Sequence, residues 1–310
     1  MDFTTFGRTK LRVSVAGLGC GGFSRLGLGT GNSPEQAEAI VRSAIEHGVN
    51  FIDTAPVYGT EAIVGRAMQG HRRDQLVIAT KAGFGRDPVV APPETIVASL
   101  DNSLRVLGTD YIDVFQLHAI QPRHYLQVRE QLLPALQREQ QKGKFRFLGI
   151  TETAPLDHHH EMAQQAIPDG HWDSLMLAYH LLHQNARNTV FPLTRQHGVG
   201  TLLMFVVRGI FAQPERLATT LRELALPPLD FLLHPDGAST MMDSAYRFVR
   251  HELGVDVVLF GTGDLDHLHT NVASLLKPPL PASDVATLKQ VYGHVVGVGL
   301  DVPTAGNSKT

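Results

Sequence analysis

Eight short apolar runs alternate with segments of helical periodicity along most of the chain, and no other feature of the sequence restricts the fold as much. Nearly continuous apolar runs are typical of strands that are buried on both faces, as in a parallel sheet. Eight strand–helix units in 310 residues predict a (β/α)8 TIM barrel, with an open doubly wound α/β sheet as the alternative. We expect one barrel domain over residues 1–310, with a loose C-terminal tail from about residue 302. The eight runs are residues 12–19, 49–54, 76–81, 111–118, 145–151, 174–179, 200–207 and 255–261.

Sequence signals for helices between the runs support the predicted alternation of strands and helices. Ser33 can cap a helix that Pro34 begins, and Gln36 completes a capping box. Apolar residues then recur on one helical face until Gly48. At the N-terminus, the segment "FTTFGRTKLRVS" predicts a short hairpin with "GRTK" as its turn.

Composition excludes several classes of partner. The formal net charge of −3 provides no electrostatic basis for binding nucleic acid or a membrane surface. No uncharged apolar run approaches the ~20 residues of a membrane helix, and the first residues lack the apolar core of a signal peptide. The single cysteine, Cys20, excludes an internal disulfide and fits a reducing compartment. These features predict a cytoplasmic protein.

Three glycines at the end of the first run and just after it, Gly17, Gly19 and Gly22, have the spacing of a dinucleotide-binding fingerprint. In a Rossmann unit the third glycine lies within a helix whose N-terminus faces the pyrophosphate. Here the next segment is "FSRLGLGTGNSP", whose three further glycines disfavour a helix. The spacing therefore predicts a tight turn at the end of a strand, not a Rossmann phosphate loop.

A run of three histidines at 158–160 raises the question of a metal site. Adjacent histidines on a helix point in different directions, so the run alone does not form a chelate. It follows "APLD", a helix-start signal, and we interpret it as a solvated first helical turn. No metal site is predicted. A metal-dependent hydrolase, suggested also by His180 and His183, is the weakest alternative because the strand ends lack a carboxylate–histidine pattern.

Ionisable residues stand at the ends of three successive apolar runs. Asp53, Lys81 and His118 end the second, third and fourth runs, and Tyr58 follows Asp53 by five residues. In a (β/α)8 barrel the strand ends surround the active site. Each residue alone has a structural explanation, since an Asp can cap a helix, a Lys can extend to water and a buried His can be a satisfied polar group. Ionisable residues at three successive strand ends, with a tyrosine nearby, predict a group of catalytic residues.

The chemistry of this set fits proton transfer to a carbonyl. A phenol has a pKa of about 10 and is a poor acid at neutral pH. A lysine ammonium within ~4–6 Å favours the phenolate, so we expect Lys81 to lower the pKa of Tyr58 and Asp53 to hold Lys81. His118 is expected to orient the substrate carbonyl. Tyr58 then donates a proton as an alkoxide forms, and the hydride has to come from a cofactor.

The same segments resemble those of a known family. "FIDTAPVYG", "VIATKAG" and "IDVFQLH" are similar to three signature segments of the aldo-keto reductase superfamily, and "GTGDLDHLHTNVASL" is similar to its final cofactor-binding segment. The similarity runs from about residue 3 to 275. It implies a (β/α)8 barrel, a nicotinamide cofactor extended across the barrel mouth, and a small-molecule carbonyl or alcohol as substrate. It also implies the catalytic tetrad Asp53, Tyr58, Lys81 and His118, with Tyr58 as the general acid.

The resemblance extends to cofactor contacts, where this sequence departs from the family pattern. The usual Ser-Asn pair after the fifth strand is Thr151 and Glu152 here, and Met176 stands where Gln is usual. Tyr179 aligns with the aromatic residue that stacks on nicotinamide. The end of the first strand, which includes Gly19, lies near the nicotinamide ribose in the family.

The final segment departs from the family pattern in its charges. Members that prefer NADPH often carry Arg and Lys for the 2′-phosphate, and these positions are His267 and Gly261 here. Arg208 is a candidate substitute. NADPH is the expected cofactor, with NADH as the alternative. The predicted cofactor-binding residues are Gly19, Thr151, Glu152, Tyr179, Arg208, Gly261, Thr262, Gly263, His267 and Asn271.

The sequence therefore favours an NAD(P)H-dependent carbonyl reductase or alcohol dehydrogenase. The alternative is a regulatory protein of the same fold that binds a nicotinamide nucleotide with little turnover. The departures at Thr151, Glu152 and Met176 support that alternative, and the intact tetrad argues against it. The sequence indicates neither a particular substrate nor an oligomeric state.

Overall fold

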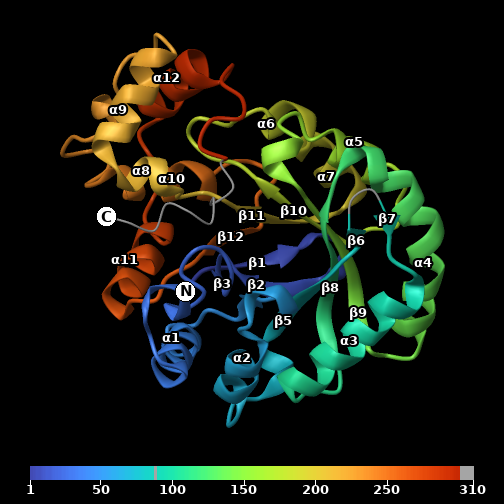
Figure 1. Ribbon diagram of the computed structural model, residues 1–310. Helices are drawn as coiled ribbons and strands as arrows, with labels where there is room; N and C mark the ends of the chain where they lie inside the picture. The colour runs from blue at the N-terminus through green and yellow to red at the C-terminus, as the bar shows by residue number, and fades with distance from the viewer. Residues whose placement is uncertain (87–88, 301–310) are drawn as a thin grey trace.

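The computed structural model describes residues 1–86 and 89–300. Eight parallel strands close into a barrel with helices around the outside (Figure 1). Each barrel strand pairs with the next one along the chain, and β12 closes the ring against β3. This confirms the predicted (β/α)8 barrel, and the predicted tail from about residue 302 lies outside the described residues. The barrel strands are β3 (Ala16–Gly19), β4 (Phe51–Asp53), β5 (Val77–Gly83), β8 (Ile112–Ile120), β9 (Phe145–Glu152), β10 (Ser174–Ala178), β11 (Gly200–Met204) and β12 (Val257–Phe260).

The first helix begins with the predicted capping box. The Ser33 hydroxyl accepts a hydrogen bond from the Gln36 N–H, and the Gln36 side chain accepts one from the Ser33 N–H. Within the described part of the chain, no helix is long and apolar enough to cross a membrane. The helices are α1 (Pro34–Glu46), α2 (Glu61–Met68), α3 (Pro93–Leu107), α4 (Tyr125–Gln141), α5 (Glu161–Ala166), α6 (Ala186–Thr189), α7 (Phe191–His197), α8 (Gly209–Ala212), α9 (Pro214–Glu223), α10 (Met241–Arg250), α11 (Leu265–Leu275) and α12 (Ala282–Tyr292).

Two short hairpins add to the barrel. β1 (Phe3–Phe6) and β2 (Leu11–Ser14) pair antiparallel at the N-terminus, which confirms the predicted hairpin. The predicted strand at 12–19 is wrong as a single element, because its first part belongs to this hairpin and only β3 enters the barrel. A second hairpin, β6 (Gly85–Arg86) with β7 (Val89–Val90), follows β5.

The N-terminal hairpin covers the amino end of the barrel. The Arg8 N–H donates to the carbonyl of Gly198, just before β11. Phe6 packs edge-on against Phe51, with ring centroids 5.5 Å apart. Hairpin and strand residues thus form one apolar cluster inside the barrel, which consists of Phe6, Leu11, Val13, Phe51, Val77, Ala79, Val114, Met176, Leu202 and Val257.

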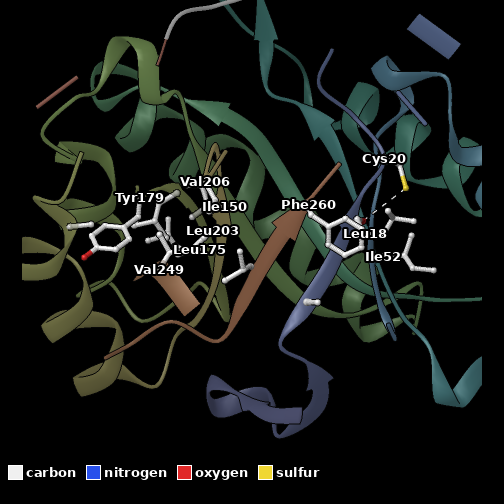
Figure 2. Close-up of a cluster of buried hydrophobic side chains, with 14 of the residues drawn as sticks. Leu18, Cys20, Ile52, Ile150, Leu175, Tyr179, Leu203, Val206, Val249 and Phe260 are labelled. Carbon is white, nitrogen blue, oxygen red and sulfur yellow. Dashed lines mark hydrogen bonds between the residues drawn. The ribbon is translucent and has the colours of Figure 1, made fainter. Parts of the chain in front are cut away.

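The opposite faces of the strands form a second, larger cluster. Successive strand residues point to opposite faces, so the residues between the inward ones pack outward against the helices. Figure 2 shows part of this outer layer, including Leu18 of β3, Ile52 of β4 and Phe260 of β12. Burial on both faces explains why the strands are nearly continuous apolar runs.

The three histidines at 158–160 do not form the predicted solvated helical turn. α5 begins at Glu161, and the Asp157 carboxylate accepts its N–H. The first two histidines are exposed, but His160 is fully buried with a φ of 56°. Its Nδ1 lies 2.7 Å from Oε2 of Glu152, which satisfies the buried imidazole. Across residues 1–86 and 89–300, no three His, Cys, Asp or Glu side chains are grouped to hold a metal ion.

Candidate active site

Strand alternation brings the predicted catalytic residues together. Along β4, β5 and β8 the inward-facing positions continue from the apolar cluster to Asp53, Lys81 and His118 near the carboxyl ends. These strands are neighbours in the barrel. In the pairing of β5 with β8, Lys81 lies opposite Gln116 and Gly83 lies opposite His118. The three predicted side chains therefore face one another at the barrel mouth.

Asp53 and Lys81 form a buried ion pair. The Lys81 Nζ lies 2.6 Å from each carboxylate oxygen of Asp53, and it donates to the Thr54 carbonyl at 3.0 Å. Lys81 is fully buried, and Asp53 is 3% exposed. Burial alone disfavours the ammonium, but Asp53 and Tyr58 together outweigh it and hold the pKa of Lys81 above its ordinary value. Lys81 therefore carries a fixed positive charge at the mouth.

Tyr58 lies beside this pair, on a short 3-10 turn that begins at Pro56. Its hydroxyl is 3.3 Å from Nε2 of His118, and the Lys81 Nζ is 5.0 Å from its ring centroid. Gly21 lies against the Tyr58 ring, because a Cβ at this position would come within 2.5 Å of Cε2. At Gly21 the glycine-rich stretch after β3 thus makes room for the tyrosine.

Burial sets the protonation states of Tyr58 and His118. It raises the pKa of Tyr58, and the charge of Lys81 only partly offsets this rise. The expectation of a lowered Tyr58 pKa is therefore wrong, because burial raises this pKa by more than the Lys81 ammonium lowers it. Burial, with the charge of Lys81, lowers the pKa of His118 to about 3. At neutral pH the site presents a protonated phenol and a neutral imidazole.

Gln116 is a site residue that the sequence analysis did not identify. Its Nε2 donates to Oδ1 of Asp53 at 3.1 Å, and the side chain is fully buried. It precedes His118 by two residues and therefore faces the same side of β8. That spacing is the signal that could have found it. Gln116 gives the Asp53 carboxylate a second partner besides Lys81.

Three of the predicted cofactor residues meet where β12 closes the barrel on β3. A Cβ at Gly261 would lie 3.2 Å from the carbonyl oxygen of Gly19, and a Cβ at Gly263 would lie 2.3 Å from the Cα of Gly27. Asn32 donates to the Gly263 carbonyl at 2.7 Å. The long loop after β3 is thereby fixed against the turn after β12, and we call this place the glycine seam.

Thr262, His267 and Asn271 lie in the same turn and in α11. The Thr262 hydroxyl accepts the Asp264 N–H at 3.0 Å. Asp264 caps α11 and accepts the His267 N–H at 2.8 Å. The His267 side chain is 76% exposed, and Asn271 is half-buried.

Glu152 and Tyr179 point away from the barrel mouth, which contradicts their predicted contacts with nicotinamide. Glu152 falls on an outward position of β9, and Tyr179 directly follows β10, on the side that packs against α10. Glu152 accepts the Ala178 N–H at 2.8 Å and is 2% exposed. The Tyr179 ring stacks on Phe248 of α10 and its hydroxyl donates to Glu252. Figure 2 shows this hydroxyl directed away from the strands.

The last two predicted cofactor residues are Thr151 and Arg208. Thr151 is 1% exposed, and its hydroxyl accepts the Ala119 N–H at 2.6 Å. Arg208 follows β11, and its guanidinium lies over the Phe205 ring, 4.0 Å from the centroid. The structure thus places Thr151 against β8 and Arg208 in the segment after β11.

The fold and the site together define a class of protein. A phenol, a neutral imidazole and a buried ammonium lie together at the mouth of a (β/α)8 barrel. The chain matches the model of the Aldo/keto reductase family over residues 17–293. It belongs to that family and is an NAD(P)-dependent oxidoreductase.

Individual relatives agree with this assignment. The chain is 32% identical to L-galactose dehydrogenase from Arabidopsis thaliana over 304 residues, which cover 94% of this chain and 93% of the relative. It is 26% identical to the aldo-keto reductase YhdN from Bacillus subtilis (strain 168), covering 84% of this chain and 85% of that protein. The holo form of the aldo-keto reductase AKR11C1 from Bacillus halodurans superposes with a TM-score of 0.75 at 26% identity, covering 94% of this chain and 96% of that chain.

Proposed function

We propose that this enzyme interconverts a carbonyl compound and an alcohol by hydride transfer, with Tyr58 as the general acid in reduction. The observation that carries the proposal is the Tyr58 hydroxyl, which lies 3.3 Å from Nε2 of His118 and beside the buried Lys81–Asp53 pair. A carbonyl oxygen between Tyr58 and His118 would be within hydrogen-bond reach of both groups. Such a placement activates the carbonyl for attack.

In the proposed reduction, the neutral His118 donates a hydrogen bond from Nε2 to the substrate oxygen and orients the carbonyl. A bound nicotinamide cofactor supplies the hydride to the carbonyl carbon. As negative charge develops on the oxygen, Tyr58 transfers its hydroxyl proton to it and becomes a phenolate. The charge of Lys81 stabilises this phenolate, and Asp53 holds Lys81 in place. The alcohol leaves, and Tyr58 regains a proton from solvent.

The glycine seam fits the phosphates of a dinucleotide in part. Gly261 is exposed, so its backbone is open, and the N–H groups of the following turn and of the start of α11 can receive phosphate oxygens. In contrast, the Asp264 carboxylate already caps α11, and no Lys or Arg stands between Gly261 and Asn271. We therefore propose NADPH as a cofactor with weaker discrimination against NADH than is usual in the family.

We expect His267→Arg to increase the preference for NADPH over NADH. The exposed His267 stands at the usual Arg position, and a guanidinium binds a phosphate through two hydrogen bonds while always carrying its charge. The measurement is kcat/KM for both cofactors in wild type, in His267→Arg and in His269→Arg. His269→Arg is the matched control, because His269 is another exposed histidine of α11.

The ratio of kcat/KM for NADPH to that for NADH should rise in His267→Arg and stay as in wild type in His269→Arg. A wild-type ratio that is already strongly in favour of NADPH and is unaffected by His267→Arg would contradict this assignment. Another group, such as Arg208, would then bind the 2′-phosphate.

A substrate panel tests the proposed function itself. The protein is mixed with NADPH or NADH and aldehydes or ketones, and with NADP⁺ or NAD⁺ and alcohols or sugars, while the absorbance of the reduced cofactor is followed. L-Galactose is included first, because the Arabidopsis thaliana relative is named for its oxidation. Turnover that requires Tyr58 supports the proposal. Tight nucleotide binding without turnover across the panel would favour the regulatory alternative.

A further inference from the structure

The residue after the candidate catalytic histidine has a strained backbone. Ala119 has a φ of 59°, in the left-handed region that residues with a Cβ rarely adopt. The pairing of β8 with β9 is irregular at this point: Leu117 lies opposite Ile150 and Ile120 lies opposite Glu152. β8 therefore contains one extra residue, which forms a bulge. Bulges and strained residues next to active sites commonly re-aim a side chain.

Two threonines of the neighbouring segment hold both polar groups of Ala119. The Thr151 hydroxyl accepts the Ala119 N–H at 2.6 Å, and the Thr153 hydroxyl donates to the Ala119 carbonyl at 2.5 Å. Thr151 is 1% exposed, so water cannot readily replace its hydrogen bond. The bulge breaks the regular ladder here, and these hydroxyls take over bonds that a strand would make through its backbone.

We propose that Thr151 and Thr153 are positioning residues that hold the bulge of β8 and thereby aim His118 at the hydroxyl of Tyr58. The proposal rests on the proposed role of His118 in orienting the substrate. It assigns Thr151 a different task from the cofactor contact predicted from the sequence. His118 directly precedes Ala119, whose N–H and carbonyl are bonded to the two threonines. The backbone conformation that these hydrogen bonds fix therefore sets the direction of the His118 ring.

A threonine-to-valine change removes the hydroxyl while keeping a similar shape. In Thr151→Val the Ala119 N–H loses its partner, and the left-handed backbone is expected to relax toward a regular strand. The His118 ring then moves away from the two groups that face it, Tyr58 and Lys81. Because burial and the charge of Lys81 are what depress the pKa of His118, such a move would shift that pKa upward.

The test uses nuclear magnetic resonance of the imidazole nitrogens in the free protein, so it does not depend on turnover. Comparison with His118→Gln identifies the His118 signals among those of the 16 histidines. Thr201→Val is the matched control, because Thr201 is also fully buried, accepts one backbone N–H and donates to one carbonyl. It lies at the amino end of β11, away from the mouth. Thr151→Ser, which keeps the hydroxyl, is the conservative variant.

We expect the His118 signals to shift at pH 7 in Thr151→Val and Thr153→Val, and to stay as in wild type in Thr151→Ser and Thr201→Val. With an active substrate, kcat/KM should fall by about 10- to 100-fold in Thr151→Val, while the Kd for the cofactor is unchanged. Unchanged His118 signals in Thr151→Val would overturn the proposal, and a weakened cofactor Kd alongside them would make Thr151 a cofactor ligand. An equal shift in Thr201→Val would also overturn it, since general destabilisation would then explain the change. Failure of the proposed function alone would leave the His118 shift in place without turnover.

Discussion

Replacing Tyr58 with phenylalanine is expected to lower kcat for carbonyl reduction by ~10²- to 10⁴-fold, because the proposed general acid is lost. The aromatic ring remains, so its packing against Gly21 is preserved and the Kd for the cofactor should change little. Stopped-flow measurement of hydride transfer and fluorescence titration of cofactor binding check the two halves of this expectation. Tyr292→Phe is the control, since the Tyr292 hydroxyl donates to the backbone carbonyls of Pro227 and Pro228.

A Tyr58→Phe variant that keeps more than about a tenth of wild-type turnover, with hydride transfer shown to limit the rate, would remove Tyr58 from its proposed role. A loss of cofactor affinity as large as the loss of turnover would also contradict it. The phenol would then act in binding and not in proton transfer. The control should keep both its turnover and its cofactor affinity.

Replacing Lys81 with methionine is expected to reduce the free energy of unfolding by about 3–5 kcal/mol at neutral pH, as removal of one partner of a buried ion pair does. Asp53 would be left buried without its cation. Burial already raises the pKa of Asp53, and Lys81 opposes that rise, so the variant should raise it further. Urea denaturation at pH 5, 6 and 8 measures the effect. Lys142→Met is the control, since its side chain is 62% exposed in a surface pair with Glu139.

The sign of the pH dependence follows from this raised pKa. A carboxyl whose pKa is higher in the folded state than in the unfolded state holds a proton that unfolding releases, so stability falls as the pH rises through that interval. The deficit of Lys81→Met should therefore be smaller at pH 5 than at pH 8. The double variant Asp53→Asn with Lys81→Met should recover much of the loss. A deficit that is independent of pH, and is not reduced in the double variant, would contradict the buried pair as its source.

The same substitution should change the pH–rate profile. Lys81 opposes the rise in the pKa of Tyr58 that burial causes, so without it the phenolate becomes harder to form. In the proposed mechanism, oxidation of an alcohol needs that phenolate as the base. The increase of the oxidation rate with pH should therefore move to higher pH in Lys81→Met. Asp53→Asn should produce a smaller shift, because it only loosens the lysine. Identical profiles for wild type and Lys81→Met would show that Lys81 does not tune the acid.

The barrel and the meeting of the predicted catalytic side chains could be predicted because both follow from where strands end. Apolar runs that finish in Asp53, Lys81 and His118 place these residues at one end of a parallel barrel, and the structure brings them together. Glu152 and Tyr179 failed because resemblance assigns a role by position along the chain, whereas strand alternation decides which face a side chain occupies. Counting alternate residues from the inward Met176 would have placed Tyr179 outside the barrel.

Other features depend on the register between paired strands and on close contacts between residues distant in the chain. Neither follows from a simple pattern in one sequence. The bulge at Ala119 appears only when β8 is paired with β9. His160 looked like a surface residue because its partner Glu152 lies eight residues away, on an outward position of β9. Gly21 belongs to a stretch with fingerprint spacing, but its requirement for glycine comes from the ring of Tyr58.

The N-terminal hairpin has a consequence for the path by which protons reach Tyr58. Phe6 and Phe51 close the barrel from below, and the fully buried Ala79 and Val114 lie between them and the active site on β5 and β8. Lys81 and Asp53 therefore lie directly above a layer of buried apolar side chains. In the proposed mechanism, the proton that Tyr58 gives up in each turnover is then replaced from the mouth side of this layer and not through it. Substitutions in the hairpin should accordingly alter the free energy of unfolding without changing how Tyr58 regains its proton.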